Sequence, residues 1–425
     1  MQNKQAIILL FSANIISGIA QGITMIAIPW YFIEIKEEAS LFGLIYAGIT
    51  LASLGWSLYS GTLIDKYSRK KMFVSVTSIG FLVIGSVALY GFASGEVPMW
   101  LIAVVFGFTM FNYQIHYPTL YAFGQEITSA KDYSKINSYL EIQGQAANIA
   151  AGALGALLLS GVNPDTLALF GIEEMPFEIT PLEMHDIFLI DASTYLVAAI
   201  IISFISYKPI VDRQIDIGSI KERIRQGVEF LKENLLLFHF GNASYSVFVF
   251  VLLCVHLLIP MYVDNHLQET AGLFSLSYML YATGALSAGV WIRKMFHEKS
   301  FIKGIIIMMS ICMLGTFAIA FTKSIYLFVL YSLMLGVTNA AVRIMRVTYL
   351  FNHVPNGIIG RVSSVFHVIN ILLRFAFIGL FSLAYFDQDN NIIYAFLIFG
   401  VFLFLSIIPL YKYRQKLESP SSISR

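Results

Sequence analysis

Uncharged apolar runs of membrane-spanning length dominate this 425-residue sequence. The first extends from Gln5 to Ile33, with no charged residue before Glu34. About 20 apolar residues suffice to cross a bilayer, and this run is too long for a removable signal peptide. Because 57% of the residues are hydrophobic and only 12% are charged, the chain cannot cover a water-soluble surface. We therefore predict an all-α integral membrane protein.

Hydropathy and turn residues together predict twelve transmembrane helices. They are expected at residues 5–33, 39–61, 72–94, 98–124, 135–160, 187–207, 235–263, 271–292, 302–322, 324–350, 361–385 and 391–411. If the N-terminus is cytoplasmic, most of the 27 basic residues lie in cytoplasmic segments, whereas the outer loops hold only Lys36 and Lys323. This asymmetry predicts that both termini are cytoplasmic, and it places the acidic segment 161–186 outside.

The helices are predicted to form two six-helix pseudo-repeats, because Ile28–Tyr31 recurs as Ile259–Tyr262 and the loop from Gly61 recurs from Gly289. The expected parts are a bundle at 1–207, a cytoplasmic linker with an amphipathic helix at 208–234, a second bundle at 235–413 and a cytoplasmic tail at 414–425. Ser219 and Glu222 have the spacing of a capping box. We expect the apolar face of this linker helix to lie on lipid rather than on a partner.

The basic loop Gly61–Phe73 resembles the hallmark loop of the major facilitator superfamily, except that Ser68 replaces its second glycine. The resemblance implies two six-helix repeats around a central cavity and secondary active transport by alternating access. Asp65 is expected to meet the amide end of the eleventh helix, where the helix dipole favours an acid. Gly61 would allow a close helix approach. The expected members of this cytoplasmic latch are Gly61, Asp65, Arg69, Gly360 and Arg361.

Four further segments resemble the branch of that family containing macrolide-efflux pumps and the enterobactin exporter. They are His116–Pro118, Lys135–Tyr139, Gln226–Leu231 and Gly360–Val362. This resemblance implies export of an amphipathic small molecule, such as a drug, a macrolide-like compound or a siderophore, across a bacterial inner membrane. Two departures concern proton antiport: Thr109 stands where many antiporters carry arginine, and Ala151-Gly152 replaces a Gly-Pro pair. Protons are therefore one candidate coupling ion among others.

Ionisable groups inside membrane spans cost roughly 2.5–3.5 kcal/mol on insertion scales, so each needs a cavity or a partner. The candidates for substrate binding or proton coupling are His116, Glu141, Gln145, Asn148, Asn339, Arg343, Arg346, His367, Asn370 and Arg374. We predict that Glu141 pairs with Arg343 or Arg346 when the cytoplasmic side closes, and binds a proton when it opens. The alternative for any of these groups is a static pair that only holds helices together.

Other functions stay open at this point. Three arginines in the second half also suit uptake or flipping of an anionic metabolite or lysolipid. A membrane enzyme or sensor is an alternative of another class, although the sequence has no phosphate loop and no hydrolase or metalloprotease motif. Cys254, His256 and His367 are metal-ligand types, but their expected depths differ, so we expect no metal and no cofactor. The expected partners are a small-molecule substrate and lipid, without nucleic acid, for a monomer.

Overall fold

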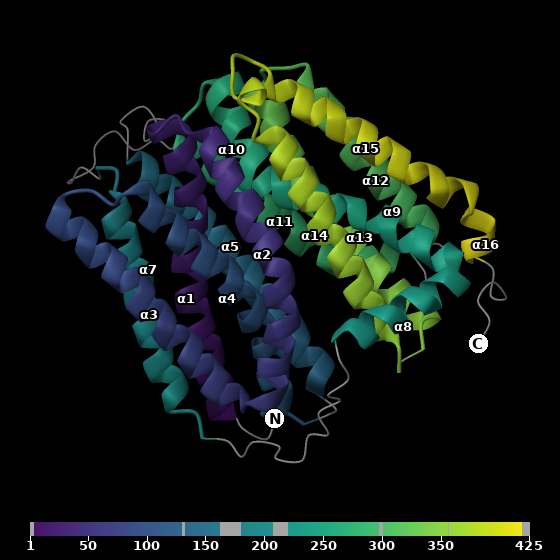
Figure 1. Cartoon of the computed structure of the whole chain (residues 1–425), viewed down its shortest axis with the longest axis horizontal. Coiled ribbons are helices and arrows are strands. Elements are labelled where there is room, and N and C mark those ends of the chain that lie inside the picture. The colour runs from purple at the N-terminus through teal and green to yellow at the C-terminus, as the bar shows by residue number, and fades with distance from the viewer. Residues whose placement is uncertain are drawn as a thin grey trace. The chain divides into compact units, whose positions relative to one another are not determined.

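The computed structural model describes residues 4–129, 132–161, 180–206, 220–296, 301–355 and 357–418. Within these ranges the regular structure is helical throughout (Figure 1). Twelve of the described helices are long and apolar enough to cross a membrane. The all-α, twelve-span prediction is confirmed. The acidic segment at 162–179, the predicted helix cap at Ser219 and the last residues of the tail lie outside the described ranges.

The observed helix bounds follow the predicted spans to within one or two turns. In the first half they are α1 (Lys4–Trp30) with the π-helical turn η1 (Tyr31–Ile35), α2 (Ala39–Lys66), α3 (Arg69–Ser94), α4 (Met99–Glu126), α5 (Tyr133–Ser160) and α7 (Met184–Ser203). Next come α8 (Ile220–Glu233), α9 (Leu235–Leu253), η3 (Cys254–Leu258), α10 (Ile259–Met261), η4 (Tyr262–Leu267), α11 (Ala271–Met295) and α12 (Phe301–Ala320). The remainder are α13 (Ile325–His353), α14 (Ile359–Phe381), η6 (Ala384–Phe386), α15 (Ile392–Lys412) and α16 (Arg414–Glu418).

The repeated Ile-Pro-x-Tyr sequences have a shared local structure. In the first copy, η1 begins two residues after Pro29, and in the second, η4 begins two residues after Pro260. Proline cannot donate the backbone hydrogen bond of a regular helical turn, so the helix widens nearby. The seventh span, predicted as one regular helix, is therefore interrupted by π-helical segments.

The chain divides into two compact units, and two of their boundaries fall inside helices. Unit 1 comprises Met1–Glu37, Ala52–Ile215 and Glu269–Met279, and unit 2 comprises Glu38–Leu51, Asp216–Gln268 and Leu280–Arg425. Consequently α2 and α11 each contribute one segment to either unit. We describe each unit by itself.

Small residues bring the helices of unit 1 close together. A Cβ atom added at Gly22 of α1 would lie 2.6 Å from the Cβ of Ala151 on α5, and Gly18 faces Ala147 at 3.6 Å. This is the small-residue spacing that lets membrane helices approach closely. The helix α3 packs along α7 (Figure 1). In this contact Gly80 of α3 receives the ring of Tyr195 of α7.

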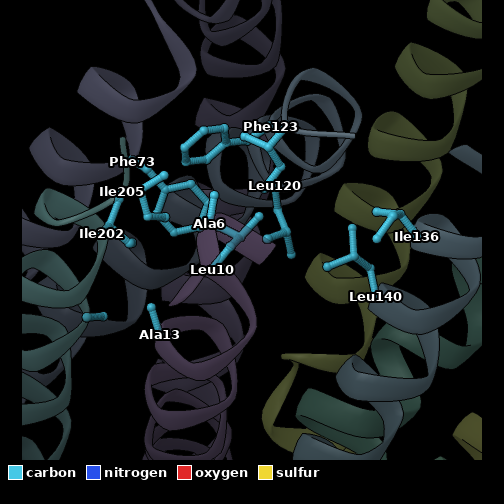
Figure 2. Packing of buried hydrophobic residues seen from close by; sticks show 12 residues of the cluster. Ala6, Leu10, Ala13, Phe73, Leu120, Phe123, Ile136, Leu140, Ile202 and Ile205 are labelled. Atoms are coloured by element: carbon cyan, nitrogen blue, oxygen red, sulfur yellow. The ribbon is translucent and has the colours of Figure 1, made fainter. Parts of the chain in front are cut away.

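A buried apolar cluster closes one end of unit 1, the end at which α1 begins (Figure 2). Its members are Ala6, Leu10, Ala13, Phe73, Leu120, Phe123, Ile127, Ile136, Leu140, Ala198, Ile202 and Ile205. Three polar contacts join helices at the same end. Arg69 at the start of α3 pairs with Glu126 at the end of α4 at 3.4 Å, and the Lys70 ammonium donates to the carbonyls of Ser203 and Ile205. These ends of α1, α3, α4, α5 and α7 therefore pack together as one end of unit 1.

In unit 2 the linker helix α8 packs against α14. A Cβ atom at Gly227 would lie only 2.5 Å from the carbonyl oxygen of Arg361, and the side chain of Leu231 is 2% exposed. The prediction that the apolar face of this helix lies on lipid is therefore wrong along this stretch, because that face is used for helix packing. Two of the segments quoted for the family resemblance, Gln226–Leu231 and Gly360–Val362, lie against each other here.

Candidate functional site

A stripe of polar side chains runs along α1 and was missed in the sequence. Asn14, Ser17, Gln21 and Thr24 follow one another at i, i+3, i+7 and i+10, which places them on one helix face. All four are buried. None of these residues is ionisable, but their helical spacing within an apolar run is the signal in the sequence that indicates a polar helix face.

This stripe forms one wall of a pocket enclosed by α1, α4 and α5. The pocket is lined by Asn14, Gly18, Gln21, Tyr113, His116, Tyr117, Leu120, Tyr121, Leu140, Gly144, Ala147 and Asn148. Three tyrosines of α4 occur at i, i+4 and i+8, and the rings of Tyr113 and Tyr117 stack with their centroids 5.6 Å apart. The lining of this described pocket includes no lysine, arginine, aspartate or glutamate. It offers ring faces and neutral hydrogen-bonding groups.

His116 is held firmly at this pocket. Its Nε2 atom lies 2.8 Å from Oδ1 of Asn14, and its ring contacts Phe73 with centroids 4.8 Å apart. The first contact ties α4 to α1, and the second ties it to the apolar cluster at the start of α3. The structure thus places the predicted residue His116 in the pocket wall, with its partner on the missed stripe.

Glu141, Gln145 and Asn148 share a face of α5, as their spacing predicts. The hydroxyl of Tyr121 donates to Glu141 at 3.0 Å, and the amide of Gln145 donates to the same carboxylate at 3.3 Å. Tyr121 and Asn148 also line the pocket, so the carboxylate adjoins it through Tyr121. Pairing of Glu141 with Arg343 or Arg346 stays a prediction.

A second acidic side chain, Asp191 of α7, was not predicted. Its side chain is 0% exposed, and its Oδ2 atom accepts a hydrogen bond from Thr24 at 2.8 Å. One turn later the hydroxyl of Tyr195 accepts from the amides of Gln21, at 2.6 Å, and Asn112, at 2.7 Å. The signal in the sequence was a lone acid within the apolar run of the sixth predicted span.

In unit 2, Arg346 is bound within its own bundle. One guanidinium nitrogen donates to the carbonyl of Ser244 at 2.9 Å, and the guanidinium lies 3.7 Å from the ring centroid of Tyr245. Carbonyl and ring faces both stabilise a desolvated cation. Nearby on α13, Asn339 donates to the hydroxyl of Tyr281 at 2.7 Å. Arg343 and Arg346 also repel each other, because both guanidinium groups are positively charged.

Arg374 of α14 lies in a second polar group of the same unit. It contacts the hydroxyl of Tyr46, whose ring packs edge-on against His256 at 5.8 Å. The neighbouring predicted residues differ: Asn370 is buried, whereas His367 is exposed. Within the described ranges no three His, Cys, Asp or Glu side chains are arranged to hold a metal ion.

The sequence profile of the Major Facilitator Superfamily matches residues 10–378. This chain belongs to that superfamily. The nucleoside transporter NupG has a similar structure, with a TM-score of 0.68 and 13% identity over 96% of this chain and 99% of that chain. A D-xylose-proton symporter has a TM-score of 0.66 and 12% identity over 97% of this chain and 98% of that chain. A bacterial homologue of the iron transporter ferroportin in an inward-facing state has a TM-score of 0.63 and 14% identity over 96% of this chain and 98% of that chain. No curated protein matches the sequence. At these identities the similar structures show a shared fold.

Membership makes this chain a transporter, so a membrane enzyme is set aside. In the loop after α2, this transporter has a serine where the family pattern has its second glycine, and the structure shows what that serine does. Ser68 stands at the second glycine and caps α3, because its hydroxyl accepts from the backbone amide of Lys71 at 3.4 Å. Serine is a preferred N-cap residue. The replacement therefore gives α3 a firm start.

The residues predicted to latch the cytoplasmic side lie at the ends of α2, α3 and α14. Arg69 is committed to Glu126 within unit 1, and Gly61 has no heavy atom of the described residues within 4 Å of an added Cβ. Asp65 lies near the end of α2, but its side chain is outside the described part. Gly360 and Arg361 lie in the first turn of α14, against α8. The latch between Asp65 and Arg361 stays a prediction.

Proposed function

We propose that this facilitator exports an amphipathic small molecule, such as a drug, a macrolide-like compound or a siderophore, by alternating access. The supporting observation is the lining of the small pocket of α1, α4 and α5, whose tyrosine faces and neutral amides suit an amphipathic molecule once the pocket widens during transport. The motifs shared with the macrolide-efflux and enterobactin branch point the same way. We also propose that it acts as a monomer in a bacterial inner membrane, with both termini cytoplasmic.

A flux assay tests the substrate class. The purified protein is reconstituted in proteoliposomes, and movement of a labelled macrolide is compared with movement of a labelled lysolipid. Macrolide flux above that of protein-free liposomes supports the proposal. Flux of neither compound, in a preparation whose folding is verified by gel filtration, argues against both classes. A drug-susceptibility and metabolite comparison of cells with and without the gene then narrows the substrate.

Uptake or flipping of an anionic metabolite or lysolipid is a second candidate. It is favoured by Arg343, Arg346 and Arg374, because arginine side chains inside membrane spans commonly mark the path of an anionic substrate. Arg346 is nonetheless already engaged by Ser244 and Tyr245. Lysolipid flux without macrolide flux in the same assay would favour this candidate over export.

We propose protons as the coupling ion and Glu141 as a group that carries one. The carboxylate adjoins the pocket through Tyr121, and it accepts hydrogen bonds from the Tyr121 hydroxyl and the Gln145 amide. Glu141→Gln should abolish flux driven by a pH gradient, because the amide cannot bind or release a proton, while substrate exchange between the two sides persists. Tyr121→Phe removes one donor but keeps the carboxylate, so it should retain gradient-driven flux. Normal gradient-driven flux in well-folded Glu141→Gln would contradict the proposal.

A further inference from the structure

Asp191 is the acid most deeply enclosed in the described part of unit 1. It lies in the apolar middle of α7, with its side chain 0% exposed. Thr24 is bonded to Oδ2, whereas Oδ1 is buried without a hydrogen-bond partner among the described residues. No lysine, arginine or histidine of the described ranges forms an ion pair with it. Among the described residues, the Thr24 hydroxyl is thus the one hydrogen-bond partner of the Asp191 side chain.

This environment suits a neutral carboxyl group rather than a carboxylate. A buried anion needs a cation or several hydrogen bonds, and one hydroxyl does not replace the water that the anion has lost. A protonated carboxyl can instead donate from Oδ2 to the Thr24 hydroxyl, leaving Oδ1 as an uncharged carbonyl oxygen. An unpaired neutral oxygen is far less costly to bury than an unpaired anionic one.

The ionisable groups that face Asp191 do not supply a charge. Tyr195 on α7 and Tyr113 on α4 are the titratable groups that interact with it. Thr24 and Gln21 face it or its neighbour from α1. The helix α3, which packs along α7, carries no ionisable residue between Lys71 and Tyr90. The protonation of Asp191 is therefore set by burial and by polar neutral groups.

A line of polar groups links Asp191 to the pocket. Thr24, its partner, follows Gln21 by one turn of α1, and Gln21 both lines the pocket and donates to Tyr195. The Tyr195 hydroxyl accepts two amide bonds, so its own proton is left to donate. These hydroxyl and amide groups can hydrogen-bond water that enters between the pocket and the buried acid, and a proton can then reach Asp191 through that water.

We propose that Asp191 is a proton-binding site of this transporter, distinct from Glu141, which holds a proton in the enclosed state and exchanges it when water enters along the polar face of α1. The role of Asp191 in coupling rests on the transport function proposed above. The binding and exchange of its proton do not depend on that function, because both can be measured without any substrate.

Infrared spectroscopy of the purified protein in detergent tests this site. At neutral pH the spectrum of the wild-type protein minus that of Asp191→Asn should contain the carbonyl stretch of one protonated carboxyl, which moves in D₂O. Glu141→Gln, the matched control, should keep this band. Raising the pH should remove the band reversibly. A protonated-carboxyl absorption that is identical in the wild type and Asp191→Asn would overturn the proposal, as would a band that never titrates while the protein stays folded.

A second variant, Thr24→Val, keeps the proposal testable if Asp191→Asn does not fold. Thr24→Val keeps the shape of the side chain but removes the hydroxyl partner of Asp191, so the band should move to higher frequency without loss of amplitude. An unshifted band in folded Thr24→Val would assign it to another acid and would reject Asp191. Asp191→Glu should restore a titrating band at a different frequency.

Discussion

At the scale of single residues, Glu96 forms an ion pair and a hydrogen bond that join two helix ends of unit 1. Beyond η1, the ammonium of Lys36 donates to Glu96 in the turn between α3 and α4, and the hydroxyl of Tyr31 donates to the same carboxylate at 3.1 Å. The hydrogen bond from Lys36, followed by that from Tyr31, lowers the pKa of Glu96 below its ordinary 4.5. The bond to Glu96 raises the pKa of Lys36.

The lowered pKa makes a prediction about acid stability. A depressed carboxyl pKa gives stability that is fully present above the unfolded-state value and is lost as pH falls through the folded-state value. The thermal midpoint of the wild type should therefore exceed that of Glu96→Gln at neutral pH, and the two should converge below about pH 4.5. The difference should be small, because the pair is solvent-exposed. Glu37→Gln, another exposed acid of this end, serves as the control. A difference independent of pH would contradict the assignment.

At the scale of helices, close packing at a glycine determines which face of α8 contacts a neighbouring helix. The linker helix α8 has an apolar face that lipid could have covered equally well, yet Gly227 sits against the backbone of Arg361 on α14. A glycine backbone lets two helices approach more closely than any side chain allows. The α8–α14 contact therefore depends on one missing Cβ atom.

Gly227→Ala should destabilise unit 2. The added Cβ would lie 2.5 Å from the Arg361 carbonyl oxygen and 2.9 Å from a Val365 methyl group, so α8 and α14 must separate. Overpacking of this kind typically costs about 1–3 kcal/mol. Gly289→Ala on α11 is the matched control: it meets nothing within 4 Å, and alanine should improve the helix by roughly 0.5–1 kcal/mol. Thermal midpoints in detergent measure both. A thermal midpoint of Gly227→Ala equal to that of the wild type would show that the packing of α8 on α14 does not depend on this close contact.

At the scale of the whole molecule, alternating access requires one side of a transporter to close while the other opens. Two helices, α2 and α11, belong partly to each compact unit. Asp65 near the end of α2 and the amide end of α14 at Gly360 and Arg361 are the residues predicted to latch the cytoplasmic side. An acid at a helix amino end gains ~0.3–1 kcal/mol, and up to ~2 kcal/mol when partly buried.

Asp65→Asn should shift the population toward the inward-open state by weakening this latch. Distances between pairs of spin labels on the cytoplasmic ends of the helices measure the shift in unliganded protein, and a loss of ~1 kcal/mol would change the ratio of states about fivefold. Asp65→Glu keeps the charge and should leave the distribution nearly unchanged. Unaltered distances in Asp65→Asn would exclude the latch.

From the sequence alone one could predict the twelve spans, the two repeats and the α5 face bearing Glu141, because apolar length and helical period are properties of consecutive residues. The partners of these residues were not predictable. Thr24 meets Asp191 across 167 positions, and Gln21 meets Tyr195 across 174. Lipid and helix interiors are equally apolar, so hydropathy does not specify how a membrane helix is rotated or which face meets a neighbour. Only the packing of α1, α4 and α7 determined that Asp191 is enclosed, and only the contact at Gly227 determined that α8 covers α14.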